Sequence, residues 1–268
     1  MQKKNWPNFS KNLISKVSKV IQSGKINYTN GPLGKKFEKN FSKFVKNKYS
    51  IAICNGTVAL EVAIKSLGLA KNSEIIVPAR SFFSSASCIV NTGYKPIFVD
   101  IDLLTQNISL NEIKKKITKN TKALICVHLG GLPCDMTELR AIADEWGVPI
   151  IEDAAHAVGA TYKGHPIGDI SEYTMFSFQA IKHLTTSDGG MLMLKDQSQI
   201  EKAKRIRWFG IDRSAKQGGI WENDIVEIGY KYQMTDIGAA MGLAALEELQ
   251  DALDHRIRLF NAYKKGLS

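Results

Sequence analysis

Chemically active residue types in this 268-residue sequence gather in three places, each at the end of a short apolar run. The first is the segment CNGT at 54–57, where an apolar run ends and a helical pattern begins at Thr57. Backbone N–H groups and a hydroxyl therefore meet at a helix N-terminus, an arrangement that binds phosphate. The alternative is a plain helix start, at which the Thr57 hydroxyl bonds only the backbone.

The second place is the segment IIEDAAH at 150–156, where two carboxylates, Glu152 and Asp153, close an apolar strand. Successive strand residues point to opposite faces, so only one of the two can face a ligand crevice. A buried carboxylate there needs a partner, and a cationic ring nitrogen of a ligand would serve. The alternative is that the carboxylate only caps a helix.

The third place is the segment MFSFQAIKHLTTSDGG at 175–190, where Lys182 follows an apolar strand by four residues. Burial lowers the pKa of a lysine amine and frees it to form a Schiff base, although Lys182 taken alone fits a surface lysine better. A phosphate cradle, a carboxylate and a Schiff-base lysine are together what pyridoxal phosphate requires of a protein. GxGxxG, GxxxxGK[ST], GxSxG and HExxH patterns are absent from the sequence, which weakens nicotinamide, ATP, serine-hydrolase and zinc-protease interpretations.

Alternating strand and helix patterns surround these segments. Seven runs rich in Ile and Val predict strands, at 49–54, 74–78, 95–101, 122–128, 148–153, 173–178 and 190–195. Helical spacing predicts helices at 37–45, 57–67 and 136–146, with Asp135 as an N-cap and Gly68 and Gly147 as C-caps. The pattern predicts an α/β fold with a mostly parallel, seven-stranded sheet, helices on both faces and ligands beyond the carboxyl ends of the strands.

The segment from Thr235 to the end predicts one long helix. Such a helix would leave apolar positions such as Leu246, Leu249 and Leu253 partly uncovered, a patch that promotes association. The chain therefore looks as if it stops early.

Composition is that of a folded globular protein, with 44% apolar and 23% charged residues. The net charge of +10 arises in residues 1–50, which hold 12 Lys and 1 Glu, and it predicts a solvated lysine-rich face, not a nucleic-acid site. The sequence has four single cysteines, no signal-peptide pattern and no apolar run near the ~18 residues that span a bilayer. These features favour a cytoplasmic protein with free thiols. Cys126 and His128 alternate along one strand, and without a second ligand pair we expect no metal site.

The sequence resembles the DegT/DnrJ/EryC1/StrS family of sugar aminotransferases, which are fold-type I pyridoxal phosphate enzymes. The matching segments run in family order from about Asn30 to Leu249: CNGTVALEVAI, EIIVPARSFFSSASCIVNTGYKPIFVDID, VHLGGLPCDM, IIEDAAHAVGATYKGHPIGDI, FSFQAIKHLTTSDGGML and YKYQMTDIGAAMGLAALEEL. The resemblance implies that Lys182 forms the Schiff base and that Asp153 pairs with the pyridine nitrogen. It assigns the ring-hydroxyl contact to His156, where the family commonly has Gln. The remaining cofactor contacts that it implies are Gly56, Thr57 and Ser177 at the phosphate and Phe82 on the ring.

The chain departs from the family pattern at Lys231-Tyr232-Gln233, where the family often has Asn-Tyr-Arg. That Asn commonly reaches the phosphate of the neighbouring subunit, so the resemblance implies a homodimer with a shared active site in which Lys231 supplies a charge. Family chains also continue into a small C-terminal domain that helps to form the sugar-nucleotide pocket. We therefore expect a cofactor-binding large domain with an N-terminal helical segment at 1–234. Residues 235–268 would form an interdomain helix and the start of the small domain, the remainder being absent.

The resemblance implies a pyridoxal phosphate-dependent aminotransferase that converts a nucleotide-linked keto-sugar to an amino sugar, with glutamate or glutamine as donor. A sugar 3-dehydratase is one alternative, because dehydratases of the family replace the lysine with His. Here His183 stands one position after Lys182, which favours amino transfer. An inactive or regulatory fragment of the same fold is the other alternative, and the presence of both Lys182 and Asp153 argues against it. We expect no nucleic-acid or membrane partner.

Overall fold

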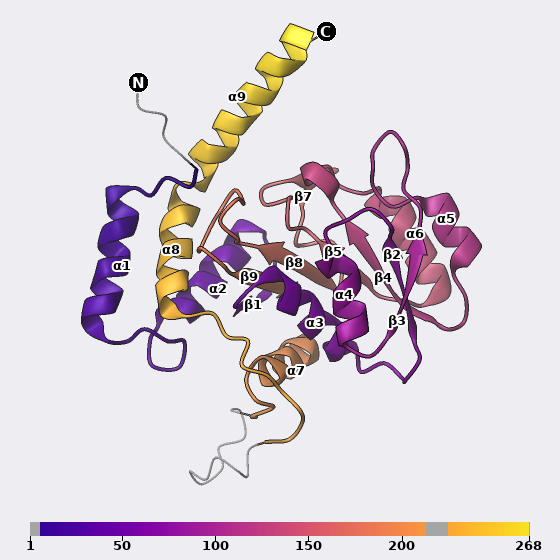
Figure 1. Ribbon diagram of the computed structural model, residues 1–268, viewed down its shortest axis with the longest axis horizontal. Helices are drawn as coiled ribbons and strands as arrows, with labels where there is room; N and C mark the ends of the chain where they lie inside the picture. Colours follow the sequence, from indigo (N-terminus) through magenta and orange to yellow (C-terminus); the bar gives the residue numbers. More distant parts are fainter. Residues whose placement is uncertain (1–5, 213–224, 268) are drawn as a thin grey trace.

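Seven strands form one sheet at the centre of the structure, a computed structural model that describes residues 6–212 and 225–267 (Figure 1). The strands are β1 Tyr49–Ile53, β2 Glu74–Pro78, β3 Lys95–Val99, β4 Thr121–Val127, β5 Ile150–Asp153, β8 Tyr173–Ser177 and β9 Gly190–Leu194. Each corresponds to one of the predicted runs. Two further strands of two residues each, β6 Thr161–Tyr162 and β7 His165–Pro166, form a small hairpin that the sequence pattern did not predict.

The sheet is mostly parallel. Its strands lie in the order β1-β9-β8-β5-β4-β2-β3, and β9 runs antiparallel to both of its neighbours while the other pairs are parallel. Strands β5, β8 and β9 are buried along their whole length, which is why they are apolar on both faces. The predicted α/β class with a mostly parallel seven-stranded sheet is confirmed.

The helices begin and end at residues that the sequence marks. They are α1 Lys11–Ser23, α2 Leu33–Phe44, α3 Gly56–Leu67, α4 Ser84–Asn91, α5 Leu110–Lys116, the short 3-10 turn η1 Leu129–Gly131, α6 Met136–Trp146, α7 Gln197–Arg207, α8 Asp236–Glu247 and α9 Leu249–Leu267. The Asp135 side chain accepts the Glu138 N–H at the start of α6, as predicted. Gly68 and Gly147 end α3 and α6 with φ of 61° and 62°, a region that glycine enters without strain.

Helices cover both faces of the sheet. On one face α3, α4 and α7 pack on a core that includes Ile125 of β4. On the other face α2 and α8 pack around Phe41 and Phe176, and α5 and α6 cover the part of the sheet that includes Leu124. Adjacent residues of β4 thus serve different cores, which fixes the strand's register.

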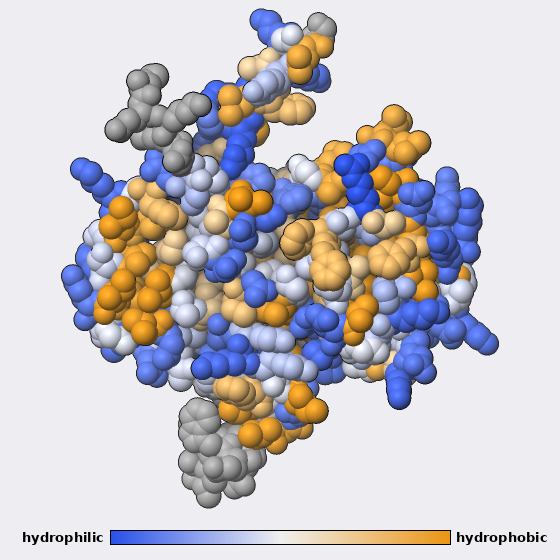
Figure 2. Space-filling model, viewed as in Figure 1, coloured by the Kyte–Doolittle hydropathy of each residue, from blue (hydrophilic) through white to orange (hydrophobic). Residues whose placement is uncertain are grey.

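The lysine-rich N-terminal region folds onto α8. In α2 the predicted apolar stripe is buried, with Phe37 and Phe41 fully covered, while most lysines of α1 and α2 face solvent. Helix α1 packs against α8, and Lys16 of α1 pairs with Glu247 at 2.5 Å. Figure 2 shows an apolar patch on the outer side of α1, where Ile14 and Ile21 are exposed.

The prediction of one unbroken helix from Thr235 is wrong. The chain bends at Glu248, between α8 and α9. The Ser10 hydroxyl donates to Glu248 Oε1 at 2.6 Å, and the bend turns Leu249 into the core, where it is 1% exposed. Tertiary contacts from the N-terminal region therefore interrupt a pattern that is helical throughout.

Beyond the bend, α9 points away from the sheet (Figure 1). Leu246 and Leu253 are half-buried, as expected, whereas the expectation that Leu249 is uncovered is wrong. The exposed apolar residues lie further along α9 and include Ile257 and Phe260 (Figure 2). Within the described residues, no helix combines the length and the apolar character that crossing a membrane requires.

Candidate functional site

A cavity of about 830 Å³ opens beyond the carboxyl ends of β4, β5 and β8, the edge at which open α/β sheets bind ligands. Seven of the eight site residues predicted from the sequence line it: Gly56, Thr57, Phe82, Asp153, His156, Ser177 and Lys182. Lys231 is not among the lining residues. The three segments CNGT, IIEDAAH and MFSFQAIKHLTTSDGG thus meet in one place.

The first turn of α3 forms the anion-binding corner of this cavity. The Asn55 side chain caps the helix by accepting the Val58 N–H at 2.9 Å. The amides of Gly56 and Thr57 have no acceptor within the helix, because the first N–H groups of a helix point out of it. These amides, the Thr57 hydroxyl and the nearby Ser177 hydroxyl suit a phosphate group at the positive end of the helix dipole.

Two glycines allow strand and helix to meet closely at this corner. A Cβ on Gly56 would lie 3.1 Å from Cβ of Ser177, and a Cβ on Gly190 would lie 2.8 Å from the carbonyl oxygen of Asn55. The second contact is with a backbone atom, which cannot move aside without shifting the chain itself. Glycine is therefore required at Gly190 for β9 to run beside the start of α3.

Asp153 and Glu152 point to opposite sides of β5. Asp153 lines the cavity, is 4% exposed, and accepts hydrogen bonds from the Ser85 hydroxyl at 2.6 Å and from the Ala155 N–H at 3.2 Å. Glu152 is fully buried and bonds His128 Nε2 at 2.8 Å. Of the two carboxylates, Asp153 is the one that faces the ligand crevice.

Lys182 and His156 also line the cavity. Burial lowers the pKa of Lys182, and the charge of Asp153 opposes this shift. The pKa of His156 is lowered by burial and then by the charge of Lys182, against the opposing charge of Asp153, which favours the neutral ring. His156 Nδ1 accepts the Gly130 N–H at 3.3 Å, which leaves the ring proton on Nε2 as a donor.

Phe82 and Lys231 lie at the margins of the site. Phe82 lines the cavity but is 75% exposed, and its neighbour Phe83 is 79% exposed. Lys231 is exposed and forms an isolated β-bridge with Trp208. The structure therefore brings Phe82 to the cavity mouth and keeps Lys231 outside its own chain's cavity.

Several residues that line the cavity were not predicted from the sequence. Asn55, Ser81, Gln179 and Asp188 line the cavity, and Ser85 lies behind it as the donor to Asp153. The hydroxyl-rich segment SFFSSAS after the run at 74–78 was a signal for the serines. That Ser85 of α4 meets Asp153, 68 residues away, follows only from the tertiary fold.

The residues present fit pyridoxal phosphate. A phosphate would meet the first turn of α3 and Ser177, and a ring nitrogen would meet Asp153, whose Ser85 and Ala155 partners are both donors. Lys182, in the same cavity, carries an amine of the kind that such a cofactor can bond. A side chain at Gly56 would collide with Met175 and Ser177, so glycine keeps the start of α3 close to Ser177.

Comparison with known proteins agrees with this chemistry. Residues 7–268 match the DegT/DnrJ/EryC1/StrS aminotransferase family. The chain belongs to this family. It is 37% identical over 262 residues to the spore coat polysaccharide biosynthesis protein SpsC of Bacillus subtilis, covering 96% of this chain and 67% of that protein. It is 38% identical over 233 residues to the GDP-perosamine synthase of Escherichia coli O157:H7, covering 87% and 62%.

Several solved structures of similar fold are aminotransferases. An aminotransferase from Psychrobacter cryohalolentis superposes with a TM-score of 0.89 at 36% identity, covering 92% of this chain and 64% of that one. The PMP-form of a putative sugar aminotransferase from Streptococcus pneumoniae superposes with a TM-score of 0.91 at 32% identity, covering 98% and 71%. A PLP-form of the same protein is also known. The predicted cofactor is thus confirmed for the family, and the chain spans about two thirds of the length of its curated relatives.

Proposed function

We propose that this chain forms the cofactor-binding part of a pyridoxal phosphate-dependent aminotransferase that acts on a nucleotide-linked keto-sugar. The observation that carries the proposal is the convergence of Lys182, Asp153 and the α3 N-terminus on one cavity. The likeness to GDP-perosamine synthase supports a nucleotide-linked sugar as substrate. Glutamate or glutamine is the proposed amino donor, and the setting is the cytoplasm.

When bound, pyridoxal phosphate supplies a conjugated ring that accepts the electron pair left on the donor's α-carbon when that carbon loses a proton. Asp153, with its own oxygens fixed by Ser85 and Ala155, would hold the proton on the ring nitrogen. His156, whose Nδ1 is occupied by the Gly130 N–H, would offer its Nε2 proton to the ring hydroxyl. Each group is held before the substrate arrives, so little reorganisation is needed during reaction.

Lys182 moves the proton. Because burial lowers the pKa of Lys182, a larger share of its Nζ is a free amine at neutral pH than for an exposed lysine. The free amine would take the proton from the α-carbon of the amino donor and pass it to the cofactor carbon that carries the amino nitrogen. In the second half of the reaction it performs the same transfers in reverse with the keto-sugar.

The sugar dehydratase alternative receives no support from the cavity. In dehydratases of the family a histidine replaces the lysine, and here His183 is not among the residues that line the cavity, whereas Lys182 is. The His183 Nδ1 is buried without a hydrogen-bond partner. Amino transfer remains the proposed reaction.

We also propose a homodimer in which two chains complete each active site. Phe82, Phe83 and Ile181 are apolar, more than two-thirds exposed and close to the cavity mouth, so a second copy that covers them would remove apolar surface from water. Lys231 would then offer its charge to the partner's phosphate. Residues 1–234 would form the large domain and 235–268 the link to a small domain.

The direct test uses purified protein with glutamate or glutamine and a panel of nucleotide-linked keto-sugars. We expect the donor to convert the bound cofactor to its amine form, and one keto-sugar to restore it with formation of an amino sugar, detected by mass spectrometry. Failure of every keto-sugar despite normal conversion by the donor would overturn the proposed substrate. A protein that binds no cofactor would overturn the proposed reaction.

The dimer is tested separately by sedimentation at several concentrations. A symmetric dimer is expected, and the change Lys231→Ala should weaken cofactor retention more than it lowers folding stability. A stable monomer that retains its cofactor and full activity would contradict the shared site.

A further inference from the structure

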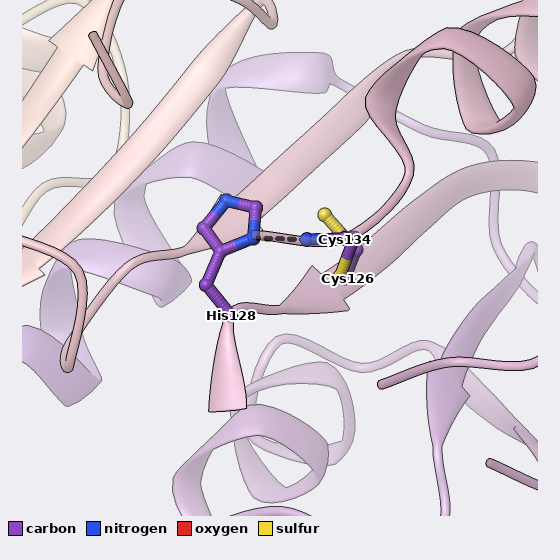
Figure 3. Close-up of side chains that lie close together, drawn as sticks. All are labelled: Cys126, His128 and Cys134. Carbon is purple, nitrogen blue, oxygen red and sulfur yellow. Dashed lines mark hydrogen bonds between the residues drawn. The ribbon is translucent and has the colours of Figure 1, made fainter. Parts of the chain in front are cut away.

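Behind the wall of the cofactor cavity, three residues of metal-binding type lie together in the core. Cys126 and His128 stand at the end of β4, and Cys134 follows the η1 turn. The two sulfur atoms and a ring nitrogen of His128 all lie within 4.8 Å of one another, and all three residues are buried (Figure 3). The sequence pattern pointed only to Cys126 and His128, and Cys134 joins them through the fold.

The backbone holds this cluster in a defined geometry. Cys126 and His128 are two residues apart, so both side chains leave the same side of the chain. The chain then turns back through Gly130 and Gly131, whose φ values of 61° and 88° suit glycine. The Cys134 N–H donates to His128 Nδ1 at 3.1 Å, and its thiol donates to the Val127 carbonyl at 3.3 Å.

A carboxylate fixes the orientation of the imidazole. His128 Nε2 lies 2.8 Å from Glu152 Oε2, and the other oxygen of Glu152 accepts from the Ser171 N–H and the Thr174 hydroxyl. Because Glu152 acts throughout as an acceptor, Nε2 carries the ring proton and Nδ1 keeps its lone pair, on the side of the two thiols. Metal-binding histidines commonly donate their second N–H to a carboxylate in this way.

The donor set selects a soft metal ion. Two thiolates and an imidazole suit Zn²⁺, and they do not suit Mg²⁺ or Ca²⁺, which take oxygen ligands. With bonds of about 2.3 Å to sulfur and 2.0 Å to nitrogen, tetrahedral coordination separates neighbouring ligand atoms by about 3.5 to 3.8 Å. The ligand atoms therefore need to move together by about 1.3 Å at most. Two thiolates would also neutralise the dication, as a buried position requires.

We propose that Cys126, His128 and Cys134 form a structural binding site for one Zn²⁺ ion, with Glu152 orienting the histidine. The ion takes the Nδ1 lone pair that the Cys134 N–H now occupies, and the fourth position is left to a water molecule or a small anion. Val127 and Leu129, which flank His128, line the cofactor cavity. The ion would thus brace the wall of that cavity without entering it, and the proposal does not depend on the reaction catalysed.

Metal content of the purified full-length chain is the first test. We expect about one Zn²⁺ per chain, and after exchange with Co²⁺ the absorption of a tetrahedral ion with thiolate-to-metal charge transfer. Zn²⁺ content should fall at least about tenfold in Cys126→Ala and in Cys134→Ala. Glu152→Gln should weaken binding about 10- to 100-fold. Cys88→Ala, which alters an equally buried cysteine in α4, should retain the full Zn²⁺ content.

The wild-type Co²⁺ spectrum decides the matter even if a cysteine variant fails to fold, because it reports sulfur ligation directly. A Co²⁺ complex without thiolate charge transfer would overturn the proposal. Equal Zn²⁺ content in wild type, Cys126→Ala and Cys134→Ala would also overturn it. So would a protein that binds neither ion and carries a disulfide between Cys126 and Cys134, because the pair would then serve as a redox couple.

Discussion

Replacing Asp153 by asparagine should remove charge from the centre of the site while leaving its shape in place. Asp153 accepts from the Ser85 hydroxyl at 2.6 Å and from the Ala155 N–H at 3.2 Å. The asparagine oxygen can keep one of these bonds, and the Ser85 hydroxyl can rotate to accept from the new amide. The change converts charge-assisted bonds to neutral ones, so we expect a loss of about 1 kcal/mol in folding stability.

The effect of Asp153→Asn on turnover should be far larger. The carboxylate is 4% exposed, so a ring nitrogen beside it would lose a charged partner that water cannot easily replace. Loss of one preorganised electrostatic contact of this kind costs about 2.7–4 kcal/mol, or roughly 10²- to 10³-fold in turnover. Turnover with saturating cofactor, cofactor content and urea unfolding should be measured together.

The matched control is Asp169→Asn. Asp169 pairs with Lys195 at 3.1 Å on the surface, a contact that contributes about 0–1 kcal/mol to stability. The substitution Asp169→Asn should therefore leave turnover unchanged. Asp153→Asn protein that retains its cofactor and turns over within tenfold of wild type would refute the role assigned to Asp153. Loss of the fold in Asp153→Asn alone would refute the claim that the site keeps its shape.

Three further changes probe the fold around the site. Arg207→Met should lower the free energy of unfolding, measured in urea, by about 3–5 kcal/mol. Arg207 is buried, and its loss leaves Glu38, 2.7 Å away, without its charged partner. A decrease below about 1 kcal/mol would contradict this. Burial, and then the charge of Arg256, lowers the pKa of His183 to about 4. Between pH 6.5 and 4 the unfolded chain therefore binds a proton at His183 that the folded chain does not bind. Stability should therefore fall as the pH drops from 7 to 5, and less so in His183→Asn; equal slopes would exclude His183 as the cause. Gly190→Ala should lower cofactor affinity, measured by fluorescence titration, because its Cβ would lie 2.8 Å from the Asn55 carbonyl oxygen; unchanged affinity would show that this corner gives way.

The sequence predicted the sheet well because its signals are local. Ile and Val runs mark strands wherever both faces of a sheet are covered, and Gly68 and Gly147 mark helix ends through backbone geometry alone. The break before Leu249 was not predicted, because it depends on contacts between α8 and the N-terminal region, including the bond from Ser10 to Glu248. Helical periodicity carries no information about such contacts.

The residues of the candidate site were likewise predictable only in part. The residues that follow each strand could be predicted, since parallel strands bring their carboxyl ends to one edge of the sheet. Ser85, which supports Asp153 from α4, and Cys134, which returns to His128 after a turn, could not be predicted. Both depend on how a loop or helix folds back on its strand, and no spacing rule expresses that.

The most direct test of the account is the identity of the lysine that bonds the cofactor. The holoenzyme is reduced with borohydride and digested, and the labelled peptide is sequenced by mass spectrometry. The account predicts a single label on Lys182, together with loss of both the label and the visible absorbance of the cofactor in Lys182→Ala. A label on any other lysine, or an unchanged spectrum in Lys182→Ala, would contradict it.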